Sequence, residues 1–70
     1  MYRTTDLYLS AYLKAKGHKV RCEHGRKCTF VFLSSVSPDI NDFFNDGMIS
    51  VTKFKNAIQD LKTLIYNSEV

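Results

Sequence analysis

Residues 28–33 read Cys-Thr-Phe-Val-Phe-Leu and form the most apolar short run in the chain. The run is rich in aromatic and β-branched residues, which fit a pleated, buried strand better than a helix. Six residues is also a usual strand length, and it is too short for an independent helix. We therefore predict a strand here. Its burial requires a neighbouring strand and a covering layer of helices.

The stretch just before this run, residues 18–24, alternates between core-like and charged side chains. An alternation with a period of two predicts a strand with one face in water. A three-residue hairpin loop, Gly25-Arg26-Lys27, would pair His24 with Cys28, Cys22 with Phe30 and Val20 with Phe32, so that the apolar residues of both strands share one face. A two-residue loop would turn the charged residues toward the core, and burial argues against that register.

A first helix is predicted over residues 5–16, where apolar side chains recur at steps of three and four. Thr4 or Thr5 is expected to cap its start, because a hydroxyl there accepts a hydrogen bond from a free backbone N–H. Gly17 is expected to end the helix in the left-handed conformation.

A second, short helix is predicted over residues 38–45. Ser37 is expected as its cap and Pro38 as its first residue, a combination that favours a helix start. Gly47 is expected to end the element. The dipeptide Met48-Ile49 could then add a short third strand at the edge of the sheet.

The last helix is predicted over residues 51–66, with Ser50 as its cap. Its apolar stripe follows the helical period over four turns and consists of Val51, Phe54, Ala57, Ile58, Leu61, Leu64 and Ile65. The whole chain, residues 1–70, is therefore expected to be one small α+β domain of two layers. The predicted order is helix, β-hairpin, short helix, possible short strand and long helix.

Composition narrows the class of protein further. The chain has 70 residues, of which 44% are hydrophobic, and this content argues against disorder. No apolar run approaches the roughly 18 residues of a membrane span, and Asp6 stands where a secretion signal would be basic or apolar. We therefore expect a cytoplasmic protein without a membrane partner. Its two cysteines would remain thiols in a reducing compartment. The alternative is a Cys22–Cys28 disulfide, because diagonal neighbours across two strands can approach bonding distance.

Three segments together resemble a family of small uncharacterised bacterial and phage proteins, classed as a domain of unknown function. These segments are the opening residues 2–13, the strand 28–32 and the stretch 54–62. The matching residues mainly pack the core and cap helices. The resemblance implies a free-standing domain and brings no activity or functional residue with it.

Two groups of residues could in principle carry chemistry, a set of zinc ligands and a cysteine–histidine pair. One sheet face could carry four zinc ligands, but their spread along two strands differs from the tight pairs of structural zinc sites. These residues are His18, Cys22, His24 and Cys28. A cysteine nucleophile would need a base and an orienting group, and no phosphate loop, dinucleotide fingerprint or zinc-protease motif accompanies Cys22 and His24. We therefore expect no enzyme, no metal, no cofactor and no small-molecule substrate.

Basic residues gather between the first helix and the hairpin loop, although the formal net charge is only +3. A two-stranded ribbon can enter a major groove, and clustered cations release counterions from phosphates. The expected nucleic-acid contacts are Lys16, Lys19, Arg21, Arg26 and Lys27. The bland interpretation is a solvated edge strand, whose lysines prevent aggregation.

An interaction module is the alternative. The outer edge of the first hairpin strand lacks a partner, and Val31 and Leu33 make the reverse face of the second strand partly apolar. Either surface could form a homodimer or receive a peptide by strand addition.

Overall fold

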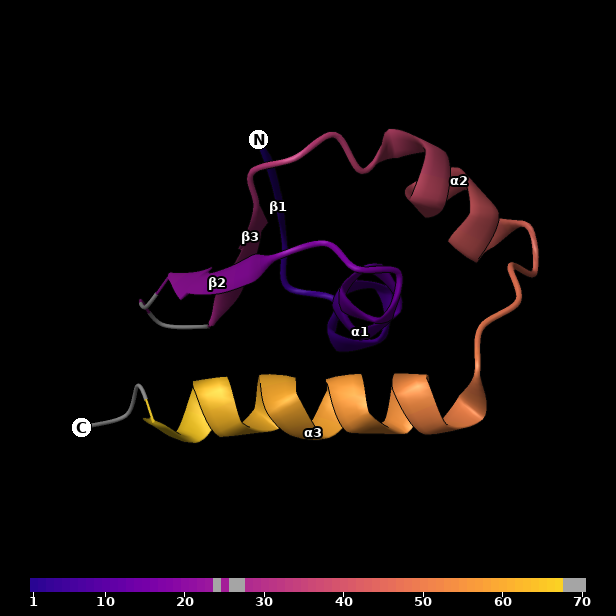
Figure 1. Ribbon diagram of the computed structural model, residues 1–70. Coiled ribbons are helices and arrows are strands. Elements are labelled where there is room, and N and C mark those ends of the chain that lie inside the picture. Colours follow the sequence, from indigo (N-terminus) through magenta and orange to yellow (C-terminus); the bar gives the residue numbers. More distant parts are fainter. Residues whose placement is uncertain (24, 26–27, 68–70) are drawn as a thin grey trace.

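The computed structural model describes residues 1–23, 25 and 28–67. It contains a three-stranded antiparallel sheet in the order β1-β3-β2 and three helices (Figure 1). The elements, in chain order, are β1 (Tyr2–Thr4), α1 (Leu7–Ala15), β2 (Val20–Glu23), β3 (Thr29–Phe32), α2 (Ser37–Phe44) and α3 (Val51–Asn67). The predicted α+β class is confirmed.

The predicted hairpin register is confirmed where the structure describes it. Val20 lies opposite Phe32, and Cys22 lies opposite Phe30. Both phenylalanines are almost fully buried, at 0% and 2% exposure. The other predicted pair, His24 with Cys28, and the loop residues Arg26 and Lys27 lie outside the described residues.

The third strand of the sheet is not the predicted Met48-Ile49. It is formed by Tyr2–Thr4, which pairs with β3 on the edge opposite β2. Met48 and Ile49 lie in the connection between α2 and α3, and Met48 is 88% exposed. The N-terminal residues reach β3 because α1 packs beside the sheet and leaves the preceding segment antiparallel to the central strand.

The start of α1 corrects the predicted cap. Asp6 is the N-cap, and its carboxylate accepts hydrogen bonds from the N–H groups of Tyr8 and Leu9 at 3.0 and 3.1 Å. Thr4 supports this turn, since its Oγ1 accepts from the Asp6 N–H at 3.1 Å. The charged carboxylate is the stronger acceptor at a helix N-terminus. Gly17 ends the helix with a φ of 103°, as predicted.

Both ends of α2 differ from the prediction by one residue. Ser37 is the first helical residue, and the N-cap is Val36, which makes no side-chain cap hydrogen bond. At the other end the left-handed conformation is taken by Asp46, with a φ of 60°. Gly47 is needed for a close approach instead, because a Cβ there would lie 2.6 Å from the Asp42 carbonyl oxygen.

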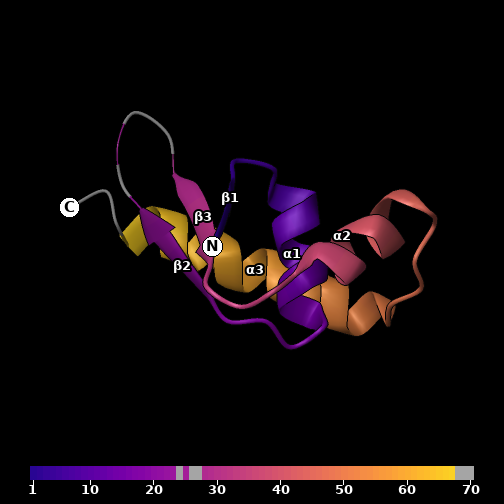
Figure 2. The same ribbon diagram turned by 90° about the horizontal axis from the view of Figure 1, so that it is seen from above.

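The long helix α3 forms the second layer. Figures 1 and 2 show the sheet over its C-terminal half, with α1 and α2 over its N-terminal half. Ser50 caps α3 as predicted, since its Oγ accepts from the Lys53 N–H at 3.4 Å. The buried core joins both layers and consists of Leu9, Ala11, Leu13, Phe30, Phe32, Val36, Ala57 and Leu61.

The apolar stripe of α3 is only partly covered. Ala57 and Leu61 are buried at its centre, whereas Val51 is 82% exposed at its start. The helix therefore extends beyond the layer that it supports. Among the described residues, no helix combines the length and apolar character needed to cross a membrane.

Candidate functional site

The outer face of the sheet, which points away from α3, carries charged side chains over an apolar centre. In the register, Arg3 of β1 and Arg21 of β2 both lie opposite Val31 of β3, so the three side chains share this face. Val31 is only 1% exposed. The long side chains of the two flanking arginines can cover it with their aliphatic stems while their charged ends stay in water.

Glu23 joins these two arginines. Its Oε1 lies 3.0 Å from Arg3 Nε, and its Oε2 lies 3.8 Å from Arg21 Nη2. Because β3 lies between β1 and β2, the Arg3–Glu23 pair spans the central strand. The hydrogen bond from Arg3 lowers the pKa of Glu23, and the same bond raises the pKa of Arg3. The three residues thus form one charged strip that keeps an excess of one positive charge.

The other predicted cations fall in two groups. Lys19 is exposed at the start of β2, and among the described residues it makes no ion pair within 4.0 Å. Lys16 is exposed at the end of α1, with its Nζ 5.4 Å from the centre of the Tyr12 ring. Arg26 and Lys27 lie outside the described residues. Arg21 and the unpredicted Arg3 thus share the outer face of the sheet, and Lys19 directly precedes β2.

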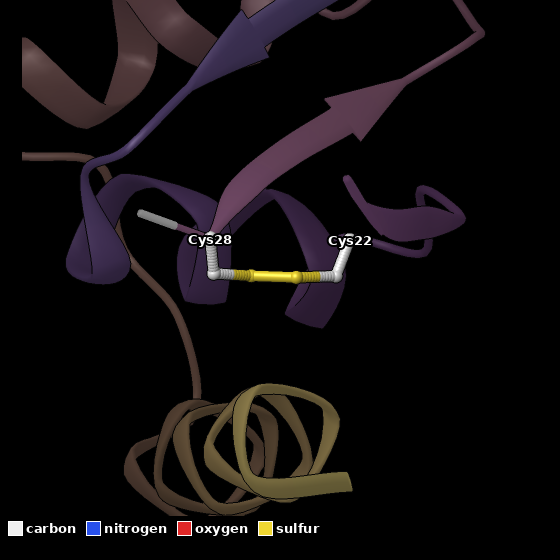
Figure 3. Close-up of a disulfide and its surroundings, with 2 residues drawn as sticks. All are labelled: Cys22 and Cys28. Atoms are coloured by element: carbon white, nitrogen blue, oxygen red, sulfur yellow. A yellow bond between two sulfur atoms is a disulfide. The ribbon is translucent and has the colours of Figure 1, made fainter. Parts of the chain in front are cut away.

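The four residues considered for zinc do not gather among the described residues, which hold no group of three or more metal-ligating side chains. Cys22 and Cys28 are joined in a disulfide, with their Cα atoms 6.0 Å apart (Figure 3). This corrects the expectation of two thiols: diagonal neighbours across a hairpin lie within disulfide distance. His18 points to another set of partners, and His24 lies outside the described residues.

His18 lies between a hydroxyl and a carboxylate. Its Nδ1 is 3.2 Å from Ser34 Oγ, and its Nε2 is 2.5 Å from Asp39 Oδ2. The histidine and aspartate side chains are 18% and 27% exposed. Sequence reasoning missed this cluster because the partners are 16 and 21 residues from His18 and belong to different elements. The turn between β3 and α2 brings them to the histidine.

A hollow of about 480 Å³ opens beside this cluster on the outer face of the sheet. It has an apolar floor and a rim of polar and positively charged groups. The residues that line it are Gly17, His18, Lys19, Val20, Arg21, Val31, Leu33 and Ser34. Leu33 is 66% exposed, in line with the predicted apolar reverse face. The hollow thus places the apolar Leu33 next to Lys19 and Arg21, an arrangement that suits an anionic molecule with an apolar part.

Comparison with known proteins identifies a family and no closer relative. The family described as Domain of unknown function (DUF5659) matches residues 1–67. No curated protein and no solved structure matches the chain. The family match agrees with the resemblance to an uncharacterised domain and assigns no site residue.

Proposed function

The chain belongs to the DUF5659 family, a domain of unknown function, and we propose that its basic sheet face binds nucleic acid weakly and largely without sequence preference. The proposal is supported by the register, in which the exposed Arg3 and Arg21 both lie opposite Val31. The exposed Lys19 directly precedes β2 and lines the same hollow as Arg21. Cations clustered on the face of a sheet can contact a phosphate backbone and release its counterions. Phosphate contacts position a protein without reading bases.

The proposed footprint extends from the sheet in both directions along the chain. Lys16 adds a cation at the C-cap of α1, in the part of the chain that leads to β2. Arg26 and Lys27 belong to the connection after β2 and are included from the sequence alone. The footprint of Lys16, Lys19, Arg21, Arg26 and Lys27 therefore supports several phosphate contacts, and Arg3 is added to it from the sheet register.

Glu23 provides the sharpest test of this face. It occupies both arginines in the free protein, so a phosphate has to displace it. Glu23→Gln should therefore raise the affinity for nucleic acid. Lys19→Glu combined with Arg21→Glu should weaken binding to every sequence and flatten the slope of log K against log salt by about 2. Fluorescence anisotropy with single- and double-stranded DNA and RNA, at about 50 and 200 mM salt, measures these changes.

Matched controls separate this face from net charge. Lys53 and Lys62 are exposed on α3, away from the sheet, so Lys53→Glu with Lys62→Glu makes the same change in charge. These controls should keep most of the affinity. Equal losses in both pairs of variants, or no binding below about 100 µM, would refute the proposal.

A second candidate function is protein–protein interaction through the open edge of the sheet, including homodimerisation. The observation that favours it is the strand order, because β2 has a partner on one side only among the described residues. Backbone groups on such an edge can pair with another strand. Binding by an edge is insensitive to salt, whereas phosphate binding weakens steeply as salt rises.

A further inference from the structure

A second polar cluster of the described residues consists of His18, Ser34 and Asp39. It adjoins the hollow that Arg21 of the charged strip also lines. His18 Nδ1 is 3.2 Å from Ser34 Oγ, and His18 Nε2 is 2.5 Å from Asp39 Oδ2. A hydroxyl, an imidazole and a carboxylate in this order are the parts that activate a serine nucleophile on unrelated folds.

The neighbours of the ring determine its tautomer. A carboxylate can only accept hydrogen bonds, so Asp39 assigns the ring proton to Nε2. Nδ1 then keeps its lone pair and accepts a hydrogen bond from the Ser34 hydroxyl. The carboxylate also holds the ring in position and stabilises the positive charge that the ring acquires when it takes a proton.

Access to the hydroxyl is provided by the hollow on the outer sheet face. Ser34 is exposed, and with His18 it lines the hollow of about 480 Å³. Leu33, which is 66% exposed, offers an apolar surface for an acyl chain. Lys19 and Arg21 line the same hollow, where a positive charge would stabilise an oxyanion that forms on an attacked carbonyl group.

We propose that Ser34 is the nucleophile of a small esterase site, with His18 as general base, Asp39 as positioning residue and short carboxylic esters as substrates. The Ser34 Oγ forms a bond to the carbonyl carbon while its proton passes to His18 Nδ1. The bond to the leaving alcohol then breaks, and the alcohol takes that proton. A water molecule, deprotonated by His18, hydrolyses the acyl-serine and releases the carboxylic acid and the free hydroxyl.

This proposal departs from the expectation that the chain is not an enzyme. That expectation considered Cys22 and His24 as the reactive pair, and neither residue takes part here. The nucleophile, the base and the positioning residue are not among the proposed phosphate contacts, whereas Lys19 and Arg21 would serve in both proposals. Labelling of Ser34 in the absence of nucleic acid therefore tests this site separately.

A covalent probe tests the nucleophile directly. A fluorophosphonate should add to Ser34 with loss of fluoride, and intact mass followed by peptide mapping locates the adduct. Ser34→Ala should abolish labelling, and His18→Gln should slow it by about 10²-fold or more. Ser35→Ala is the matched control, since Ser35 is also exposed but does not line the hollow, and it should label at the rate of the natural chain.

Turnover supplies the second readout. The natural chain should hydrolyse 4-nitrophenyl butyrate faster than buffer, and Asp39→Asn should lower kcat with circular dichroism unchanged. A kcat that is higher in Asp39→Glu than in Asp39→Asn would support a positioning role, because the glutamate keeps the carboxylate. An unlabelled natural chain, a label on a residue other than Ser34, or equal hydrolysis by the natural chain and Ser34→Ala would overturn the proposal. The histidine would then serve only to tie α2 to the sheet.

Discussion

Cys22 and Cys28 connect β2 to the residue before β3 and close the hairpin covalently. Their side chains lie on the side of the sheet that faces α1 and α3 (Figure 3). The sequence separation of six gives a small closed loop. In the chain-entropy account, such a loop removes freedom mainly from the unfolded chain and is worth about 2 kcal/mol.

Reduction of this bond should therefore lower the free energy of unfolding by about 2 kcal/mol. A domain of this size has a small margin of stability, so its melting temperature should fall by several degrees. Thermal melts with and without a thiol reductant measure the effect, and intact mass verifies the redox state. The Cys22→Ser, Cys28→Ser double variant should have the melting temperature of the reduced protein, and the reductant should not change it. An unchanged melt of fully reduced protein would show that the bond adds no stability.

The candidate sites show which residue contacts can be inferred from a sequence. The alternation around β2 correctly predicted that Arg21 lies on the face opposite to that of Val20 and Cys22, because a period of two is local information. The contacts of His18 with Ser34 and Asp39 carry no periodic signal. They depend on how the chain turns between β3 and α2. The place of Arg3 on this face was missed for another reason, because no strand was predicted at the N-terminus.

At the scale of elements, the sequence correctly predicted the helix α3 and the face with which it packs. The apolar pattern, however, covers more of that face than the structure buries. Ser50 and the 3.6-residue period predicted the start and the face of the helix. Leu61 at the centre is 0% exposed, whereas Leu64, one turn later on the stripe, is 36% exposed. Periodicity identifies the face of a helix, and the size of the layer packed against it decides how much of that face is buried.

This difference gives a paired prediction. Leu61→Ala should cost about 2–5 kcal/mol, because it removes core volume between α3 and the upper layer. Leu64→Ala should cost less, about 1–2 kcal/mol, because 36% of the residue's surface is already in water and only the remainder can lose burial. Both changes keep helix propensity high, so urea unfolding followed by circular dichroism compares packing alone. Equal costs at the two positions would mean that the covered part of the stripe has been misassigned.

The remaining elements differ in how strongly the sequence announces them. The hairpin register was predictable because a slip by one residue would expose every apolar side chain. A strand of three residues such as β1 is too short for any period to be read, so its pairing depends on tertiary contacts. The caps of α1 and α2 were misassigned by one or two residues, whereas the cap of α3, Ser50, was correct. At α1 the cause is that Thr4, Thr5 and Asp6 are all good caps, so tertiary geometry decides among them.

At the scale of the whole molecule, the shape is thin, with extents of 36 × 26 × 16 Å. A chain of this length buries a modest share of its surface, and association is a common way to bury more. β1 and β2 form the two edges of the sheet in the order β1-β3-β2. The longer of them, β2, contributes four residues to an edge that lacks a strand partner in the described chain.

We therefore expect a concentration-dependent dimer in which the β2 edges of two copies pair around a two-fold axis. Sedimentation should show dimer growing across micromolar concentrations, with little change between about 50 and 200 mM salt, because backbone pairing does not involve counterion release. Hydrogen exchange should then show slower exchange for β2 amides at high concentration than at low concentration, with α3 amides unaffected as an internal control. A strict monomer at about 100 µM would eliminate the edge-paired dimer and leave the salt-sensitive function as the better supported one.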